Sequence, residues 1–262
     1  MSSATVHFPT SLHKQTTEAV AAFFSASPVV DTVLIVNSLA RGQATPASDL
    51  DFAILVDPAV HAADIQHLEQ QWTAFAAAYP TFAQFRQSGR FANIHLDIVT
   101  GQYAAAVWDD GGGPDYFEVE IGNQVARSLP YADPGPYFQR LQAEWLPYYG
   151  EHLRSQRLSM VRDACLYDLD YVPFFVGRGL YFQAFDRLYR AFQEFLQALF
   201  IARRTYPIAY NKWIREQVEH WLNLPDLYAQ LPAILSISQL ESDELTQKAS
   251  DLQVLLAQWT QD

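Results

Sequence analysis

The order of hydrophobic and polar residues changes character near residues 131–137, where two prolines and a glycine interrupt the regular patterns. Before this point, helical periodicity predicts helices over about Ser11–Ser25 and Ala62–Tyr79, and alternating or continuous apolar runs predict strands between and after them. After it, apolar residues recur at spacings of three and four, and strand-like alternation is absent. The pattern predicts an α/β (α+β) N-terminal domain with a short mixed sheet, residues 1–130, followed by an all-α helical-bundle domain, residues 131–262.

Two stretches of the second half show the helical period most clearly. Leu180–Arg204 carries apolar residues along one broad stripe, and Asp243–Trp259 has the pattern of a closing helix packed on the same bundle. Aromatic stripes of this kind are typical of bundle cores rather than of cofactor contacts. The stripe consists of Leu180, Phe185, Leu188, Phe192, Phe195 and Leu199.

In the first half, two aspartates stand one residue apart in an otherwise apolar run, shortly after the β-branched strand predicted over Val33–Val36. Alternate side chains of a strand share a face, so Asp49 and Asp51 point the same way while Leu50 and Phe52 point into the core. Like charges on one face repel unless a cation or a basic side chain compensates them. Mg²⁺ typically takes one or two protein carboxylates together with water and phosphate oxygens. The alternative is a strand end whose acids are merely solvated.

The turn after the first of these strands has features of an anion site. Ser38 opens the segment LARG, which predicts one helical turn with Ser38 as its N-cap, and Arg41 lies near enough to add a positive charge. A strand end followed by a helix N-terminus presents backbone N–H groups to an anion, so phosphate can sit at Ser38, eleven positions before Asp49. Capping without a ligand, and a surface cation at Arg41, are the simpler alternatives for each residue alone.

Together these residues resemble the signature of the nucleotidyltransferase superfamily related to DNA polymerase β. The family pattern is Gly-Ser, commonly followed by x-Ala-Arg-Gly, and later Ser-Asp-hydrophobic-Asp-hydrophobic; this chain has NSLARG from Asn37 and SDLDF from Ser48. The resemblance is closest to the minimal nucleotidyltransferases and to the aminoglycoside and lincosamide nucleotidyltransferases. Asn37 departs from the usual glycine. Asparagine tolerates a left-handed backbone, but its Cβ lies where phosphate would approach.

The resemblance implies a nucleotidyltransferase domain in residues 1–130 and a role for each motif residue. Asp49 and Asp51 would hold Mg²⁺ and take part in catalysis. The triphosphate of ATP, or of another NTP, would be bound by Ser38, Arg41 and Ser48.

A third carboxylate is expected on a neighbouring strand. Phe91–Val99 alternates well enough for a strand, and Asp97 stands on the face opposite Leu96 and Ile98. In the resembled family, an Asp or Glu at this position completes the metal site or takes the proton from the attacking hydroxyl. Asp97 is therefore expected as a metal ligand and catalytic residue, with a plain exposed strand acid as the alternative.

The resemblance also points to Lys212 in the helical half. Pro207 is expected to end the preceding helix, and Lys212 to lie in the first turns of the next one. In the resembled enzymes the helical domain closes over the nucleotide, and a similar segment supplies a lysine to the triphosphate. Tyr210 and Trp213 would stack on the base or pack beside it. The alternative is a solvated lysine at a helix start.

The segment before the domain boundary is acidic. Residues 109–113, with two aspartates and three glycines, predict a mobile loop, and DYFEVEIGN over 115–123 alternates like a strand. Glu118 and Glu120 would then lie on the face opposite its apolar residues. They either point at a cationic acceptor or keep an edge strand solvated.

Histidine and cysteine show no metal-site pattern. The seven histidines are not spaced as zinc ligands. His95 alternates onto the Asp97 face, where contact with substrate is one interpretation and a plain surface histidine is the simpler one. The single Cys165 excludes an intramolecular disulfide and lies in an apolar helical context without an adjacent histidine.

Composition narrows the choice of partners. A chain of 262 residues that is 50% hydrophobic has material for two cores. Its net charge of −12, from 17 basic and 29 acidic side chains, disfavours nucleic acid, because affinity for a phosphate backbone rests on Lys and Arg. The sequence has neither an 18-residue uncharged apolar stretch nor a secretory signal pattern, so a cytoplasmic protein without a membrane partner is expected.

The expected function is Mg²⁺-dependent transfer of a nucleoside monophosphate, in the first place AMP from ATP, to a hydroxyl of a small molecule. Two alternatives stay open. One is an enzyme that places AMP on a partner protein, as the minimal enzymes do in toxin neutralisation, and the other is a pseudoenzyme that binds nucleotide without chemistry. The acceptor, the choice of NTP and the oligomeric state, including a homodimer, are equally open.

Overall fold

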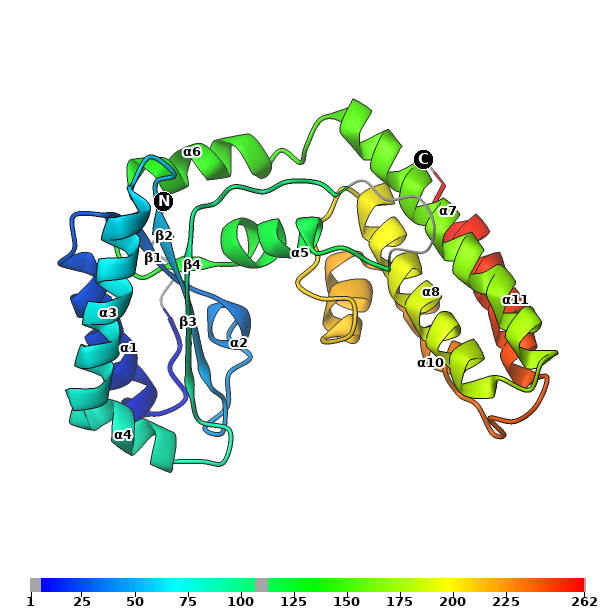
Figure 1. Ribbon diagram of the computed structural model, residues 1–262, viewed down its shortest axis with the longest axis horizontal. Helices are drawn as coiled ribbons and strands as arrows, with labels where there is room; N and C mark the ends of the chain where they lie inside the picture. The colour runs from blue at the N-terminus through cyan, green and yellow to red at the C-terminus, as the bar shows by residue number, and fades with distance from the viewer. Residues whose placement is uncertain (1–5, 107–112, 262) are drawn as a thin grey trace. The chain divides into compact units, whose positions relative to one another are not determined.

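The computed structural model describes residues 6–106 and 113–261, and this part of the chain is a mixed α/β structure with a four-stranded sheet (Figure 1). Contacts along the chain divide it into two units. Unit 1 comprises Met1–Tyr103 and Glu120–Pro147, and unit 2 comprises Ala104–Val119 and Tyr148–Asp262. The mixed α/β class agrees with the sequence, whereas the division at residue 130 stays a prediction. Of the acidic loop expected over 109–113, all but Gly113 lies outside the described residues.

Unit 1 is built on a mixed sheet with the strand order β3-β2-β1-β4. The central strand β1 pairs antiparallel with β2 and β4, and β2 pairs parallel with β3. Its elements are α1 (Ser11–Ser25), β1 (Val30–Ile35), α2 (Asn37–Ala40), β2 (Leu50–Val56), α3 (Ala62–Ala78), α4 (Pro80–Gln87), β3 (Ile94–Val99), η1 (Gly122–Ala126), β4 (Leu129–Pro130) and α6 (Pro136–Trp145).

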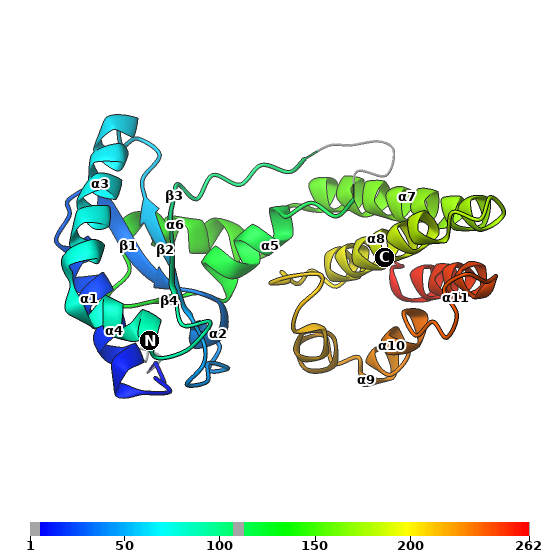
Figure 2. The ribbon, with the colours of Figure 1, turned by 60° about the horizontal axis from the view of Figure 1, so that its bottom comes forward.

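Helices α1, α3 and α4 cover one face of this sheet (Figure 2). The core between them is apolar and aromatic, with Phe24 of α1 and Phe82 and Phe85 of α4 fully buried. Burial of large apolar side chains is the dominant favourable term for such a layer, at roughly 2–3 kcal/mol each. The sequence predicted α1 over its observed range and α3 within one residue of its end, while α4, which begins at a proline, was not predicted.

The prediction of a strand over residues 115–123 is wrong. The chain there forms the short helix α5 (Phe117–Ile121), followed by the π-helical segment η1. Phe117, Glu118 and Ile121 share one helical face and are buried, whereas Glu120 is exposed. A half-buried strand would turn Glu118 to solvent, but Glu118 is buried. Helical spacing accounts for this burial, because it places Glu118 on the same face as Phe117 and Ile121.

The proline-rich segment 131–137 is tied to the sheet of unit 1. Asp31 of β1 accepts hydrogen bonds from the backbone N–H of Tyr137 and Phe138, at 3.0 Å each, and so satisfies the start of α6. Gly135 approaches the same aspartate so closely that a Cβ there would lie 2.4 Å from the Asp31 carboxyl carbon. This segment is therefore an anchored helix start rather than a linker.

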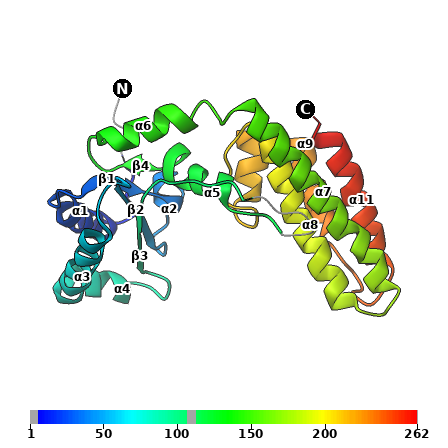
Figure 3. The same ribbon diagram turned by 45° about the horizontal axis from the view of Figure 1, so that its top comes forward.

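Unit 2 is helical throughout its described elements. Helices α7, α8 and α11 run side by side in Figures 1 and 3 and bury a continuous apolar core between them. None of the helices in the described part of the chain is both long and apolar enough to span a lipid bilayer. The elements are α7 (Glu151–Val176), α8 (Tyr181–Ala202), η2 (Glu216–Trp221), α9 (Pro225–Tyr228), α10 (Leu231–Ile234) and α11 (Glu244–Trp259).

The aromatic stripe predicted for this bundle is only partly buried. Leu188, Phe192, Phe195 and Leu199 of α8 lie in the core, as expected. Leu180, the residue before α8, and Phe185 remain 41% and 36% exposed, although Ala184 between them is fully buried. The closing helix α11 begins one residue after the predicted start.

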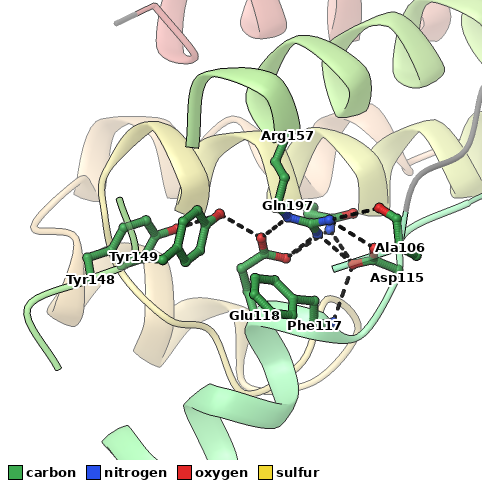
Figure 4. A network of polar contacts seen from close by, with 8 residues as sticks. All are labelled: Ala106, Asp115, Phe117, Glu118, Tyr148, Tyr149, Arg157 and Gln197. Atoms are coloured by element: carbon green, nitrogen blue, oxygen red, sulfur yellow. Dashed lines mark hydrogen bonds and ion pairs between the residues drawn. The ribbon is translucent and has the colours of Figure 1, made fainter. Parts of the chain in front are cut away.

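A buried polar network crosses unit 2 (Figure 4). The guanidinium of Arg157 donates to Glu118 Oε1 and Oε2, at 2.6 and 2.8 Å, and to Asp115 Oδ1, at 2.7 Å. Gln197 donates to both carboxylates, and the Tyr149 hydroxyl donates to Glu118 at 2.7 Å. Burial raises the pKa of Tyr149, and the adjacent Glu118 carboxylate raises it further. The phenol therefore stays a donor throughout the physiological range.

We expect the substitution Glu118→Gln to destabilise the protein by about 3 kcal/mol, because it leaves the buried guanidinium of Arg157 only partly compensated. Glu241→Gln, at an exposed position of the same unit, serves as the control and should change stability by less than about 0.5 kcal/mol. Urea denaturation followed by circular dichroism measures both. Equal stability of the two variants would contradict a structural role for the pair.

A second buried acid of unit 2, Glu194, has no side-chain hydrogen-bond donor among the described residues. Glu194 of α8 is fully buried, and burial, followed by the neighbouring Asp168 carboxylate, raises its pKa to about 8. Asp168, also fully buried, is paired with Arg187, and Arg190 Nε lies 3.7 Å from its other oxygen. Two adjacent buried carboxylates disfavour each other's charged form, so Glu194 holds its proton in the folded state at neutral pH.

This raised pKa makes stability depend on pH. Between the ordinary value of 4.5 and about 8, folded Glu194 binds a proton that the unfolded chain has lost, so stability falls as pH rises through this window. The slope from this one group is at most about 1.4 kcal/mol per pH unit. We expect Glu194→Gln to remove this contribution and Glu241→Gln, an exposed control, to keep it, as measured by urea denaturation between about pH 5 and about pH 8. Parallel pH profiles of Glu194→Gln and the native protein would contradict this assignment.

Candidate functional site

The turn between β1 and α2 lies directly beside the start of β2. Ile35 pairs with Phe52, and the next backbone N–H, that of Val36, donates to the carbonyl of Asp51 at 3.1 Å. The chain then reverses at Asn37, whose φ is +55°. Asparagine therefore adopts the left-handed backbone that the sequence led us to expect at this position. The Asn37–Ser38 turn and the acid pair consequently share one end of the sheet.

The prediction that Ser38 caps this short helix is wrong. Helix α2 begins one residue earlier, at Asn37, and its N-cap is Val36, which offers no side-chain oxygen. The left-handed residue itself starts the turn, so Ser38 is already inside it and lies half-buried. Arg41 follows directly after the helix and is also half-buried. Binding of phosphate by Ser38 and Arg41 stays a prediction.

The loop that leads into β2 is held by its own polar groups. Ser48 Oγ accepts the backbone N–H of Thr45 at 2.9 Å, and Ser48 N donates back to the Thr45 carbonyl at 2.9 Å. The hydroxyl of Ser48 thus already has a structural partner in the turn. Its predicted part in nucleotide binding stays a prediction.

A histidine that the sequence did not single out fixes the start of the acid strand. His13 of α1 is 1% exposed, and its Nε2 donates to the carbonyl of Ser48 at 3.1 Å. Its Nδ1 accepts the hydroxyl of Thr10, the N-cap of α1, at 2.7 Å. Burial lowers the pKa of His13, so the neutral ring with a proton on Nε2 fits both contacts. The residue just before Asp49 is thereby anchored to α1.

The two motif aspartates lie on one side of β2, as predicted. Leu50 and Phe52 are buried to 0% and 2%, whereas Asp49 and Asp51 are half-buried. On the parallel strand β3, His95 is the register partner of Asp51. One ligand atom from each of Asp49, Asp51 and His95 lies within 4.8 Å of the others, and His95 Nε2 is 3.5 Å from Asp49 Oδ2.

Asp97 is on the same face but is not a member of this group. It is exposed, and its register partner is Ala53, two residues further along β2 than the partner of His95. A spacing of two residues along a strand corresponds to about 7 Å. Its role as general base stays a prediction, and so does its role as a metal ligand.

The donor chemistry of the group suits a divalent cation. Two carboxylates supply oxygen ligands and negative charge, and the imidazole supplies one nitrogen. Half exposure leaves room for further ligands from solvent or substrate. The same arrangement also allows His95 to pair directly with Asp49 as an ion pair when it is protonated.

Lys212 belongs to unit 2, and the structure places it differently from the prediction. Helix α8 ends at Ala202, before Pro207, and Lys212 precedes the helical turns that start at Ile214. Its side chain is exposed, while its carbonyl accepts a hydrogen bond from Gln217 Nε2 at 2.9 Å.

The buried Gln217 also bonds Ile208 and Ala209, so it fixes the backbone of the whole segment 208–212. Tyr210 is 3% exposed and belongs to the core, whereas Trp213 is 44% exposed. The buried position of Tyr210 suits packing. Stacking of Tyr210 or Trp213 on a base stays a prediction. Binding of the triphosphate by Lys212 stays a prediction.

Comparison with known proteins adds no family assignment: no protein-family model matches the chain, and no curated protein matches it either.

We expect His13→Leu to destabilise the protein by about 1–3 kcal/mol, because it leaves the partly buried carbonyl of Ser48 without the His13 donor. His7→Leu, at an exposed position, is the control. Thermal and urea denaturation measure the difference. A variant as stable as the control would mean that the Ser48 carbonyl finds another donor and that His13 does not hold the strand start.

Proposed function

We propose that this chain is a nucleotidyltransferase that depends on a divalent cation and transfers AMP from ATP to a hydroxyl of a small molecule. The proposal is supported by the positions of the motif residues relative to one another in unit 1. The β1–β2 ladder sets the Asn37–Ser38 turn beside Asp51, so the two halves of the sequence signature meet at one sheet end. Neither half would carry this proposal alone.

In the proposed reaction, an acceptor hydroxyl oxygen attacks the α-phosphorus of ATP. A new oxygen–phosphorus bond forms, the bond from the α-phosphorus to the bridging oxygen of the β-phosphate breaks, and pyrophosphate leaves. The hydroxyl proton goes to the carboxylate of Asp97, which is exposed to incoming substrate. Asp49 and Asp51 would hold the cation, which when bound neutralises charge on the phosphates.

The charge of the molecule supports a small acceptor. With a net charge of −12, the chain offers little attraction for a polyanion such as nucleic acid. A small hydroxylated molecule, particularly a cationic one, suits an acidic surface better. The chemistry at the α-phosphorus is then mainly positioning and charge neutralisation.

We expect the native protein to bind a non-hydrolysable ATP analogue in the presence of a divalent cation, measured by isothermal titration calorimetry. It should also release pyrophosphate from ATP with at least one member of a panel of hydroxylated small molecules. Asp51→Asn should lower that release by more than about 100-fold, because it removes a cation ligand, while circular dichroism stays unchanged.

Asp133→Asn, an exposed loop residue of the same unit, is the matched control and should keep the activity. Pyrophosphate release that survives Asp51→Asn would remove the cation role of the pair. Absence of analogue binding by the native protein would overturn the proposed function altogether.

A further inference from the structure

The acid pair has a third neighbour that the sequence signature does not contain. His95 is placed by strand pairing, since it stands opposite Asp51 in the parallel β2–β3 register. Its imidazole reaches across to the next acid as well, with Nε2 at 3.5 Å from Asp49 Oδ2. The pairing of two adjacent strands sets His95 opposite Asp51, and Asp49 is the residue directly before β2.

The distances in this group suit a single ion. For ligands at about 2.1–2.2 Å from a cation, neighbouring ligand atoms of an octahedral shell lie about 3 Å apart and opposite ones just over 4 Å apart. The ligand atoms of Asp49, Asp51 and His95 all lie within 4.8 Å of one another. Side-chain rotations that shorten these separations would bring the atoms onto three positions of one shell, leaving three for phosphate oxygens and water.

The type of ligand then selects the type of cation. Mg²⁺ is a hard ion that takes oxygen ligands almost exclusively, so an imidazole adds little to its binding. First-row transition ions accept imidazole nitrogen together with carboxylate oxygen, and among them Mn²⁺ also keeps the six-coordinate geometry that a bound triphosphate requires. A site of two carboxylates and one imidazole therefore favours Mn²⁺ over Mg²⁺.

We propose that His95 is a direct ligand of the nucleotide-associated cation and that it gives this site a preference for Mn²⁺ over Mg²⁺. The inference rests on the proposed function, because the cation is the one that Asp49 and Asp51 would hold for the triphosphate. It assigns different roles to two residues of β3. His95 completes the cation site, and Asp97, about 7 Å further along the strand, is left to face the acceptor.

The competing interpretation is a plain ion pair between His95 and Asp49. The two side chains are 54% and 39% exposed, and ion pairs with such exposure contribute little, typically below about 1 kcal/mol. An ion pair would make His95 a competitor of the cation. Its removal would then strengthen the binding of Mn²⁺ and Mg²⁺ alike, whereas a ligand role predicts loss of Mn²⁺ affinity alone.

The test uses the full chain without acceptor, so that it does not depend on turnover. Mn²⁺ and Mg²⁺ are titrated separately, with and without the non-hydrolysable ATP analogue, and binding is followed by calorimetry and by the electron paramagnetic resonance signal of free Mn²⁺. We expect the native protein to bind Mn²⁺ at least about tenfold more tightly than Mg²⁺. His95→Ala should lose at least about tenfold in Mn²⁺ affinity and less than about threefold in Mg²⁺ affinity.

Two further observations make the assignment specific. Bound Mn²⁺ in the native protein should show magnetic coupling to an imidazole nitrogen in pulsed electron paramagnetic resonance, and His95→Ala should lack that coupling. His95→Asp, which supplies oxygen in place of nitrogen, should shift the preference toward Mg²⁺. His67→Ala, an exposed histidine of α3, is the control and should bind as the native protein does.

The outcomes separate the inference from the proposed function. If Asp51→Asn abolishes cation and analogue binding while His95→Ala leaves the Mn²⁺ to Mg²⁺ preference unchanged, His95 is not a ligand and the proposed function stands. If His95→Ala strengthens binding of both ions, the ion-pair interpretation replaces the ligand role. If the native protein binds neither cation nor analogue, both the inference and the proposed function are overturned.

Discussion

The register of β2 between its two neighbours is the constraint on which the rest of unit 1 depends. Leu50 and Phe52 are buried in the core, and a slip of one residue would expose them and turn Asp51 inward. Burial of an unpaired carboxylate costs several kcal/mol, and exposure of Phe52 loses about 2–3 kcal/mol more. The apolar residues therefore set the register, and the acids follow it. A substitution on the polar face can therefore change the chemistry of that face without disturbing the pairing of the strands.

The two units handle buried charge in different ways, and the difference separates structural acids from candidate functional ones. Asp115 and Glu118 are enclosed with Arg157, Gln197 and Tyr149, so their oxygens are already hydrogen-bonded within the protein (Figure 4). A ligand would have to displace those partners. Asp49 and Asp51 are half-buried, and His95 Nε2 lies 3.5 Å from Asp49 Oδ2, so incoming cations reach them at a smaller cost. Acidity by itself does not distinguish the two sets, whereas burial and partners do.

Sequence patterns over neighbouring residues predicted the structural features that depend on neighbouring residues. The helical period placed α1, α3 and α11 within one residue of their observed limits, and strand alternation placed Asp49 and Asp51 on one polar face. The same alternation failed at Glu118, because a glutamate's partner, here Arg157, lies 39 residues away and leaves no local mark. His13 was missed for the same reason, and His95 was placed on the Asp97 face without its position beside Asp49 and Asp51. Their importance comes from Ser48 and Asp51, which α1 packing and parallel pairing bring to them.

Asn37 shows how a departure from a motif can preserve the fold while changing the site. The left-handed backbone at this residue costs a non-glycine side chain roughly 1 kcal/mol, and asparagine less than most, so the turn survives the absence of glycine. The Asn37 side chain is exposed, so its Cβ meets no packed atoms of the core and the β1–β2 pairing is undisturbed. What changes is the space above the turn, where glycine would leave the backbone N–H groups open to a phosphate. Under the proposed function, a cation held by three protein ligands would compensate for a weaker phosphate turn, because both would bind the same triphosphate.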